Sequence, residues 1–185
     1  MKQKGFTLVE LMITLVVMGV LATSVLGMAT SFITNAKLRS SADEFRTGLM
    51  TAKVEAIKRN ASIIFNSDST GGWGIDVPST FTESGTLEHL QSKAAASSSL
   101  SVVAKDSNGA ALTKFRFTGS GRPSSDASTE VPSPPSYPVT YYFSVANKVC
   151  GSESGITCLN VTITSGGQIK VCNPETASTS VYGCS

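Results

Sequence analysis

The feature that most constrains the fold of this chain is a long run without charge near its N-terminus. Between Glu10 and Lys37 no residue is charged, and aliphatic side chains dominate. A helix of roughly 20 apolar residues is enough to cross the hydrocarbon core of a bilayer. We therefore expect residues 6–29 to span a membrane as a helix. Lys2 and Lys4 should stay on the cytoplasmic side, because basic residues flanking a span mark the side that is not translocated.

The position of Gly5 indicates how the N-terminus is processed. An ordinary signal peptide places its small residue and cleavage site after the apolar run, whereas Gly5 precedes it. Cleavage after Gly5 would remove residues 1–5 and keep the apolar helix. Glu10 would then lie near the edge of a membrane segment, where a charge carried to the centre costs about 2.5–3.5 kcal/mol. We expect it to pair with a cation, and the new amino group of Phe6, from its own or a neighbouring chain, is the nearest fixed one.

The stretch Gly5-Phe6-Thr-Leu-Val-Glu10-Leu resembles the type IV prepilin motif at every position. The resemblance implies cleavage after Gly5 by prepilin peptidase, methylation of the Phe6 amine, and a recognition role for Glu10 in assembly. It also implies a single-pass protein of the bacterial inner membrane, with a cytoplasmic N-terminus and a periplasmic head, that later moves into a cell-surface pilus. The alternative is a plain membrane anchor, for which motif and location would have to coincide by chance.

An amphipathic helical pattern follows the apolar run. Apolar residues recur at spacings of three and four over residues 38–56, and no proline interrupts residues 1–77. This periodicity predicts one helix from about residue 6 to about residue 59, with an apolar stripe that packs against the rest of the chain. The stripe consists of Leu38, Ala42, Phe45, Leu49, Ala52 and Ala56.

Short β-strand patterns separated by polar loops fill the rest of the chain. The expected fold class is therefore α+β, with the long N-terminal helix packed on a small, mainly antiparallel β-sheet head, as in pilins. We divide the chain into a leader (1–5), a transmembrane or filament-core helix (6–29), an amphipathic helix (30–60) and a β-rich head (61–185). Gly166-Gly167 predicts a hairpin turn, and the low-complexity residues 92–99 predict a loop. The candidate strands are Ile63–Phe65, Trp73–Val77, Leu100–Val103, Leu112–Phe117, Val139–Val145, Leu159–Ile163 and Gln168–Val171.

The junction between helix and first strand, residues 52–65, resembles that of the GspH/FimT/FimU group of minor pilins and pseudopilins, with Lys53 in place of the usual Arg. The resemblance, strongest to the FimU kind, implies a minor pilin that helps prime type IV pilus assembly and forms part of the tip complex. Its implied partners are prepilin peptidase, other minor pilins, the major pilin and a tip adhesin. Two alternatives stay open: a GspH-like pseudopilin of type II secretion, and a FimT-like pilin that binds DNA for uptake.

All four cysteines lie in the C-terminal part of the chain: Cys150, Cys158, Cys172 and Cys184. An even number beyond an export segment predicts two disulfides formed in an oxidising compartment. Local pairing, Cys150 with Cys158 and Cys172 with Cys184, is favoured because it closes short loops. A pairing of Cys158 with Cys172 across the Gly166-Gly167 hairpin stays open.

The composition gives no support to catalysis or metal binding. The single histidine, His89, excludes most Ser/His and zinc schemes, and no C-x-x-C pair is present. Asp106-Ser-Asn-Gly109 faintly resembles a calcium loop but lacks the remaining ligands, and a turn is the better reading. We expect neither an enzyme nor a cofactor, a metal or a small-molecule substrate.

Nucleic acid is not expected as a partner either. Residues 61–185 hold seven basic and nine acidic residues, a net charge of −2, so DNA binding would require a local basic patch. The candidate contacts are Arg116, Arg122 and Lys170. The first two lie in Phe115-Arg116-Phe117-x-Gly-x-Gly121-Arg122, which resembles the phenylalanine-containing strand followed by Gly-Arg in the GspH/FimT/FimU group. The segment Gly167-Gln168-Ile-Lys170 resembles the C-terminal Gly-Arg-x-Arg segment of FimT, which binds DNA, but both arginine places have changed. Lysine loses the bidentate geometry of arginine, so a hairpin edge is the favoured interpretation.

Overall fold

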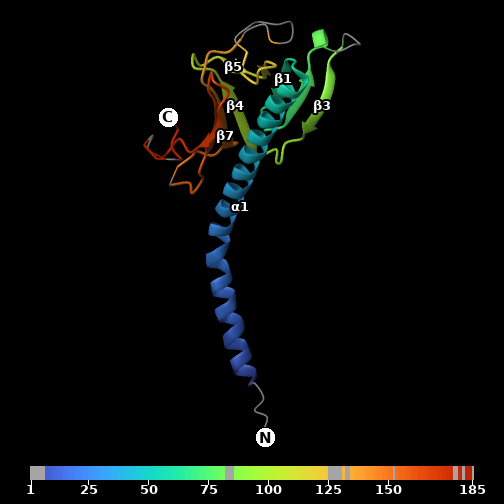
Figure 1. Ribbon diagram of the computed structural model, residues 1–185. Coiled ribbons are helices and arrows are strands. Elements are labelled where there is room, and N and C mark those ends of the chain that lie inside the picture. Colours follow the sequence, from blue (N-terminus) through green and yellow to red (C-terminus); the bar gives the residue numbers. More distant parts are fainter. Residues whose placement is uncertain are drawn as a thin grey trace. The chain divides into compact units, whose positions relative to one another are not determined.

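The computed structural model describes residues 7–81, 86–124, 131, 134–151, 153–176, 179–180 and 182–184, without the side chains of residues 22–29. Two compact units divide the chain after Thr34. The long helix α1 (Leu8–Arg59) contributes its residues up to Thr34 to the first unit and the remainder to the second, which also contains all the strands (Figure 1). The leader and Phe6 lie outside the described residues.

In the first unit, α1 presents its apolar side chains to solvent. Leu8, Leu15 and Met18 are 75%, 61% and 72% exposed, and the aliphatic residues between them are similarly open. Within the described residues, no helix reaches the combined length and hydropathy required to cross a bilayer. The expected span over residues 6–29 stays a prediction, and it includes Phe6 and the side chains of 22–29, which lie outside the description.

The C-terminal end of α1 is fixed by backbone hydrogen bonds. The N–H of Ala61 donates to the carbonyl of Ala56 at 3.2 Å, and the N–H of Asn60 donates to that of Ile57 at 3.2 Å. Asn60 has a left-handed backbone with φ of 47°, which is the Schellman arrangement that commonly terminates a helix. The chain therefore turns directly from α1 into the first strand, close to the predicted end at residue 59.

Two antiparallel sheets make up the head. Sheet A has the order β3-β2-β1-β6 and sheet B the order β5-β4-β7-β8-β9. The hairpin predicted at Gly166-Gly167 joins β8 to β9, whose Ile163 and Ile169 are partners in register. The strands of sheet A are β1 (Ile63–Ser67), β2 (Trp73–Val77), β3 (Glu88–Lys93) and β6 (Lys114–Phe117), and those of sheet B are β4 (Leu100–Lys105), β5 (Ala111–Leu112), β7 (Val139–Val145), β8 (Leu159–Ile163) and β9 (Ile169–Cys172); a short 3₁₀ helix, η1 (Ser79–Phe81), follows β2.

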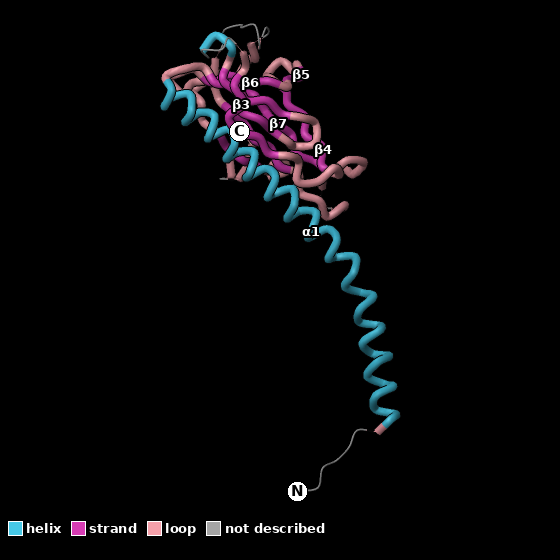
Figure 2. Tube along the Cα trace, turned by 90° about the vertical axis from the view of Figure 1, so that its right-hand side faces the viewer, coloured by secondary structure: helices cyan, strands magenta, loops and turns pink. Residues whose placement is uncertain are grey.

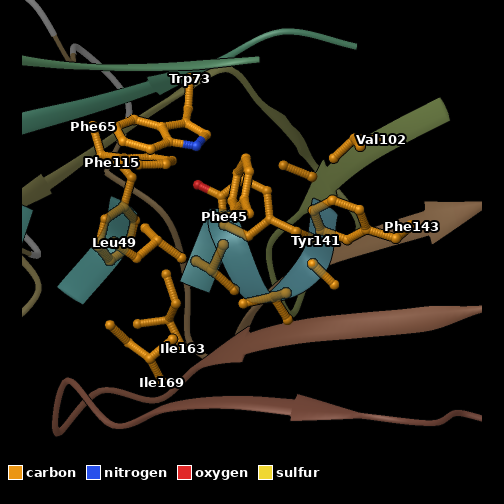
Figure 3. Packing of buried hydrophobic residues seen from close by; sticks show 14 of the residues in the cluster. Phe45, Leu49, Phe65, Trp73, Val102, Phe115, Tyr141, Phe143, Ile163 and Ile169 are labelled. Atoms are coloured by element: carbon orange, nitrogen blue, oxygen red, sulfur yellow. The ribbon is translucent and has the colours of Figure 1, made fainter. Parts of the chain in front are cut away.

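The core lies where α1 packs on both sheets (Figure 2). All six residues of the predicted stripe are 0% exposed, so that prediction is confirmed. Phe45 is central: its ring lies 5.0 Å from that of Phe65 on β1, 4.7 Å from Tyr141 and 5.3 Å from Phe143 on β7 (Figure 3). One helical side chain thus joins the two sheets.

A glycine allows the helix to approach Trp73. The Cβ that any other residue would place at Gly48 would lie 2.7 Å from Cε2 of the indole. Trp73 stacks on Phe65 with a 5.8 Å centroid distance on the other side. The glycine lowers helix stability by about 1 kcal/mol relative to alanine, and in return the largest aromatic side chain of the head packs against the helix backbone.

The α+β class with an antiparallel head is confirmed, and two details of the expected strands are wrong. The predicted strand Leu112–Phe117 is broken at Thr113, because the chain crosses there from β5 in sheet B to β6 in sheet A. The strand β3 was not predicted, and the loop expected at 92–99 starts only after Lys93. Five of the six β3 residues are exposed, so the strand carries no apolar alternation from which it could be recognised.

The core geometry predicts a large effect of Phe45→Ala. Truncating a fully buried phenylalanine costs about 3–5 kcal/mol, and Phe45 contacts both sheets. Chemical denaturation should show the free energy of unfolding lowered by that amount. The control is Met50→Ala on the same helix, where Met50 is 42% exposed and the loss should stay below about 1 kcal/mol. Equal losses in the two variants would contradict the central position of Phe45.

Candidate functional site

Glu10 lies in the first turn of α1 and forms a capping box with Thr7. The N–H of Glu10 donates to Oγ1 of Thr7 at 3.3 Å, and Oε2 of Glu10 accepts from the N–H and the hydroxyl of Thr7 at 3.5 and 3.4 Å. This reciprocal pattern satisfies donors at a helix N-terminus, and the negative charge is favourable there. The Thr-x-x-Glu spacing was a readable signal for this cap, and the sequence analysis missed it.

The cap leaves part of the Glu10 carboxylate available. Of the two carboxylate oxygens of Glu10, Oε2 has hydrogen-bond partners among the described residues and Oε1 has none. The neighbouring side chains Leu8, Val9 and Leu11 are apolar and 75%, 64% and 56% exposed. Glu10 therefore combines a structural contact within its own chain with an open oxygen on an otherwise apolar helix. Gly5 and Phe6, the expected cleavage and methylation sites, lie outside the described residues.

The cysteines form two disulfides, Cys150–Cys158 and Cys172–Cys184, which is the local pairing that the sequence analysis favoured over the link between Cys158 and Cys172. The first closes a loop that Asn35 of α1 holds. The side-chain amide of Asn35 donates to the carbonyl of Gly155 at 2.8 Å and accepts from the N–H of Thr157 at 3.0 Å. Nothing in the sequence singles out Asn35 for this role.

The second disulfide ties the C-terminal tail to β9. The N–H of Asn173 donates to the carbonyl of Tyr182 at 2.7 Å, next to the Cys172–Cys184 link. The ammonium group of Lys170 donates to the carbonyl of Gly183 at 3.3 Å. Lys170, one of the three candidate DNA contacts, is therefore half-buried and engaged with the tail.

The other two candidate contacts have different environments. Nη2 of Arg116 donates to the hydroxyl of Ser124 at 2.6 Å in a half-buried position, whereas Arg122 is exposed. Burial raises the pKa of Tyr137 to about 12, with the charge of Arg116 acting in the opposite direction. The Tyr137 hydroxyl therefore stays protonated at neutral pH and donates to the carbonyl of Ser124 at 2.8 Å. Arg116 belongs to a packed structural cluster.

The structure brings together two glycine segments that the sequence analysis compared with the FimT-containing group. Nζ of Lys53 on α1 donates to the carbonyl of Gly167 at 2.9 Å. Gly167 has φ of +77°, and a Cβ there would lie 3.0 Å from the carbonyl oxygen of Gly121. Lys53 thus fixes the β8–β9 turn against the loop that carries Arg122. Of the cations named here, Lys53 is half-buried and engaged with Gly167, and Arg122 is exposed.

The turn at Asp106 is held by its own backbone. Oδ1 accepts from the N–H groups of Asn108 and Ala110 at 2.9 and 2.8 Å, and Oδ2 accepts from that of Ser136 at 3.2 Å. Desolvation acts to raise the pKa of this carboxyl, but the backbone donors outweigh it and lower the pKa. The carboxylate serves the turn. Among the described residues, no cluster of three metal-ligating side chains is found.

Comparison with known proteins gives a family for both parts of the chain. The prokaryotic N-terminal methylation motif matches residues 1–26, and the family "Type II transport protein GspH" matches residues 41–182. The second match covers more than half of the chain, which therefore belongs to the GspH family. No curated protein matches it.

Two groups of solved structures share the fold. The type IV minor pilin FimU of Pseudomonas aeruginosa is 20% identical over 82% of this chain and 99% of its own, with a TM-score of 0.53. The minor pseudopilin EpsH from the type 2 secretion system of Vibrio cholerae is 14% identical over 76% of this chain and 99% of its own, with a TM-score of 0.54. The pilin fold is confirmed. The chain is a minor pilin or pseudopilin, a class of structural subunits rather than enzymes, and its N-terminal motif implies processing by prepilin peptidase.

The capping box allows the charge of Glu10 to be tested separately from its role as a helix cap. Glutamine also completes a capping box, but it carries no charge. If Glu10 pairs with an amino group of another subunit, Glu10→Gln and Glu10→Val should both remain in the membrane fraction and both be lost from sheared filaments. Incorporation of Glu10→Gln at the wild-type level would show that the residue acts through its cap alone.

The engaged states of Arg116 and Lys170 predict weak DNA binding. A fragment from residue 30 onwards should bind duplex DNA more weakly than about 10⁻⁴ M at physiological salt, the weak limit for non-specific binders. As a matched gain-of-function control, Gln168→Arg combined with Lys170→Arg restores two arginines and should strengthen binding. Micromolar binding by the wild type that falls steeply with salt and is lost in Lys170→Ala would contradict this prediction.

Proposed function

We propose that this protein is a minor pilin of a type IV pilus that helps prime pilus assembly and forms part of the tip complex. Its proposed partners are prepilin peptidase, other minor pilins, the major pilin and a tip adhesin. Residues 6–29 would anchor it in the inner membrane with its head in the periplasm before it enters the pilus. The methylation motif and the GspH family support an inner-membrane subunit. The assignment to a pilus and to its tip is our proposal.

The observation that carries the choice of a pilus is the stapled C-terminus. The two disulfides close loops with sequence separations of 8 and 12 residues, and such links stabilise a fold mainly by constraining the unfolded chain. A subunit at the end of a filament lacks neighbours on one side, so its head has to be stable largely by itself. A tail held against β9 suits this position.

A pseudopilin of type II secretion is the alternative that the comparisons support. The family is named for type II transport, and EpsH and FimU match this chain with nearly equal TM-scores, 0.54 and 0.53. The fold therefore favours neither filament. Arg116 and Lys170 are both engaged within the chain, with Ser124 and Gly183 respectively, which disfavours a role in DNA uptake.

Deletion of the gene separates the two filaments. We expect surface pili, counted by electron microscopy, to fall sharply while type II secretion of exported enzymes continues at the wild-type level. The wild-type gene should restore piliation, and the double variant Cys172→Ser and Cys184→Ser should restore it only in part, because the tail is released from β9. Normal pili together with lost secretion would overturn the proposal in favour of the pseudopilin.

A further inference from the structure

Other segments of the chain cover parts of the edges of the two sheets. At the β6 edge of sheet A, the N–H of Ser124 donates to the carbonyl of Arg116 at 2.9 Å, and Pro123 forms a bridge with Phe117. This segment closes the edge with backbone from the loop after β6. Exposed edges with unpaired N–H and C=O groups invite pairing with other chains, which is why proteins usually cover them.

Sheet B is covered in part at both ends. The C-terminal tail lies along the end of β9, where Asn173 bridges Gly183 beside the Cys172–Cys184 link. At the opposite end, β5 pairs with the last residues of β4, and the N–H of Val102 donates to the carbonyl of Ser69 at 2.8 Å.

The strand β3 is different. It is the outermost strand of sheet A, beside the C-terminal turns of α1 (Figure 1). Its backbone pairs with β2 on one side, with a register shift at Leu90, and no hydrogen bond joins its outer side to any residue in the described ranges. Five of its six residues are exposed. The outer edge of β3 is therefore available for backbone pairing on each side of this register shift.

The charged side chains of β3 are turned away from this edge. Glu88 pairs with Arg59 at 3.8 Å, and Lys93 pairs with Glu44 at 3.4 Å, so the charged residues at both ends of the strand contact α1. The side chain of His89 contacts that of Asp76, its partner on β2, with Nδ1 2.7 Å from a carboxylate oxygen. Charges projecting from an edge are a common protection against strand addition. Here they are engaged on the inner side, and the middle of β3, Leu90-Gln91-Ser92, is uncharged.

A groove with a mixed polar and apolar lining lies between α1 and β3, from the Lys93–Glu44 ion pair towards Arg59. One hollow of about 430 Å³ is lined by Thr47, Thr51, Trp73 and Gln91 among others. A second of about 200 Å³ shares Thr51 and Gln91 with the first and continues towards the end of α1. A strand added beside β3 would direct alternate side chains towards this groove, because successive residues of a strand point to opposite faces.

We propose that β3 is a docking edge that takes up an extended segment of another subunit as a fifth strand of sheet A. The backbone of the incoming segment supplies the hydrogen bonds, and its alternate side chains, polar and of threonine or glutamine size, fill the groove beside Thr51 and Gln91. Main-chain pairing with side-chain pockets is a general mode of peptide recognition. The proposal rests on the proposed function in taking the partner to be a subunit of the same filament.

Proline substitutions test this edge and supply their own control. In an antiparallel pair, the N–H groups of successive residues alternate between the partner strand and the outside, so of Gln91 and Ser92 one donates to β2 and the other points outward. Proline removes the N–H and is tolerated at the outward positions of edge strands. Thermal unfolding of full-length Gln91→Pro and Ser92→Pro will identify the outward position, because that variant keeps the wild-type unfolding midpoint.

The decisive readout is incorporation of the outward-proline variant into purified filaments. We expect it to fall about tenfold, equivalent to about 1.4 kcal/mol, while the variant folds normally. Wild-type incorporation of this variant would overturn strand addition and leave the proposed function intact. Absence of the wild-type chain from the filaments would instead overturn the proposed function.

Hydrogen exchange gives a second test that needs no substitution. In the full wild-type chain, the outward amides of residues 88–93 should exchange rapidly in the isolated protein and slowly in the assembled filament, with alternate residues affected. Unchanged exchange of these amides on assembly would contradict the proposal, whatever the outcome of the proline variants.

Discussion

The packing of one face of α1 against two sheets is the interaction on which the head depends. Sheets A and B are separate hydrogen-bonded units, and the rings of Phe65 and Tyr141, one from each sheet, meet at Phe45 (Figure 3). Gly48 lets Trp73 join this cluster by close contact with the helix backbone. Because the same helix continues to Leu8, the element that holds the head together also carries part of the N-terminal methylation motif.

Covalent and polar links fix the parts of the head that lie furthest from this core. Asn35 holds the loop closed by Cys150–Cys158, and Lys53 holds the β8–β9 turn, each through backbone carbonyl groups. The Cys172–Cys184 link holds the tail on β9. These three contacts hold loops and the tail in place. No comparable contact holds the outer side of β3 among the described residues, and the proposed cover for it is a segment of a partner subunit.

Sequence alone predicted the elements that carry a periodic apolar signal. The stripe around Phe45 and Leu49 and the strands β2, β7 and β8 were predicted, the strands with their observed bounds, because burial imposes a regular spacing. The strand β3 was not predicted, because it is exposed on both faces and carries no apolar alternation. The break at Thr113 was not predicted either, because a crossover between sheets leaves the local pattern of apolar residues unchanged. Of the candidate DNA contacts, Lys170 and Arg116 proved to be engaged within the chain, a tertiary fact that spacing does not encode.

The central claim is that this helix-centred head is displayed on a surface pilus after processing at Gly5. Mass spectrometry of sheared and purified pili tests it most directly. The account predicts a chain that lacks residues 1–5, begins at an N-methylated Phe6, and carries linked peptides for Cys150–Cys158 and Cys172–Cys184. A chain that retains its leader in assembled pili, or one found in the secretion apparatus but absent from pili, would contradict it.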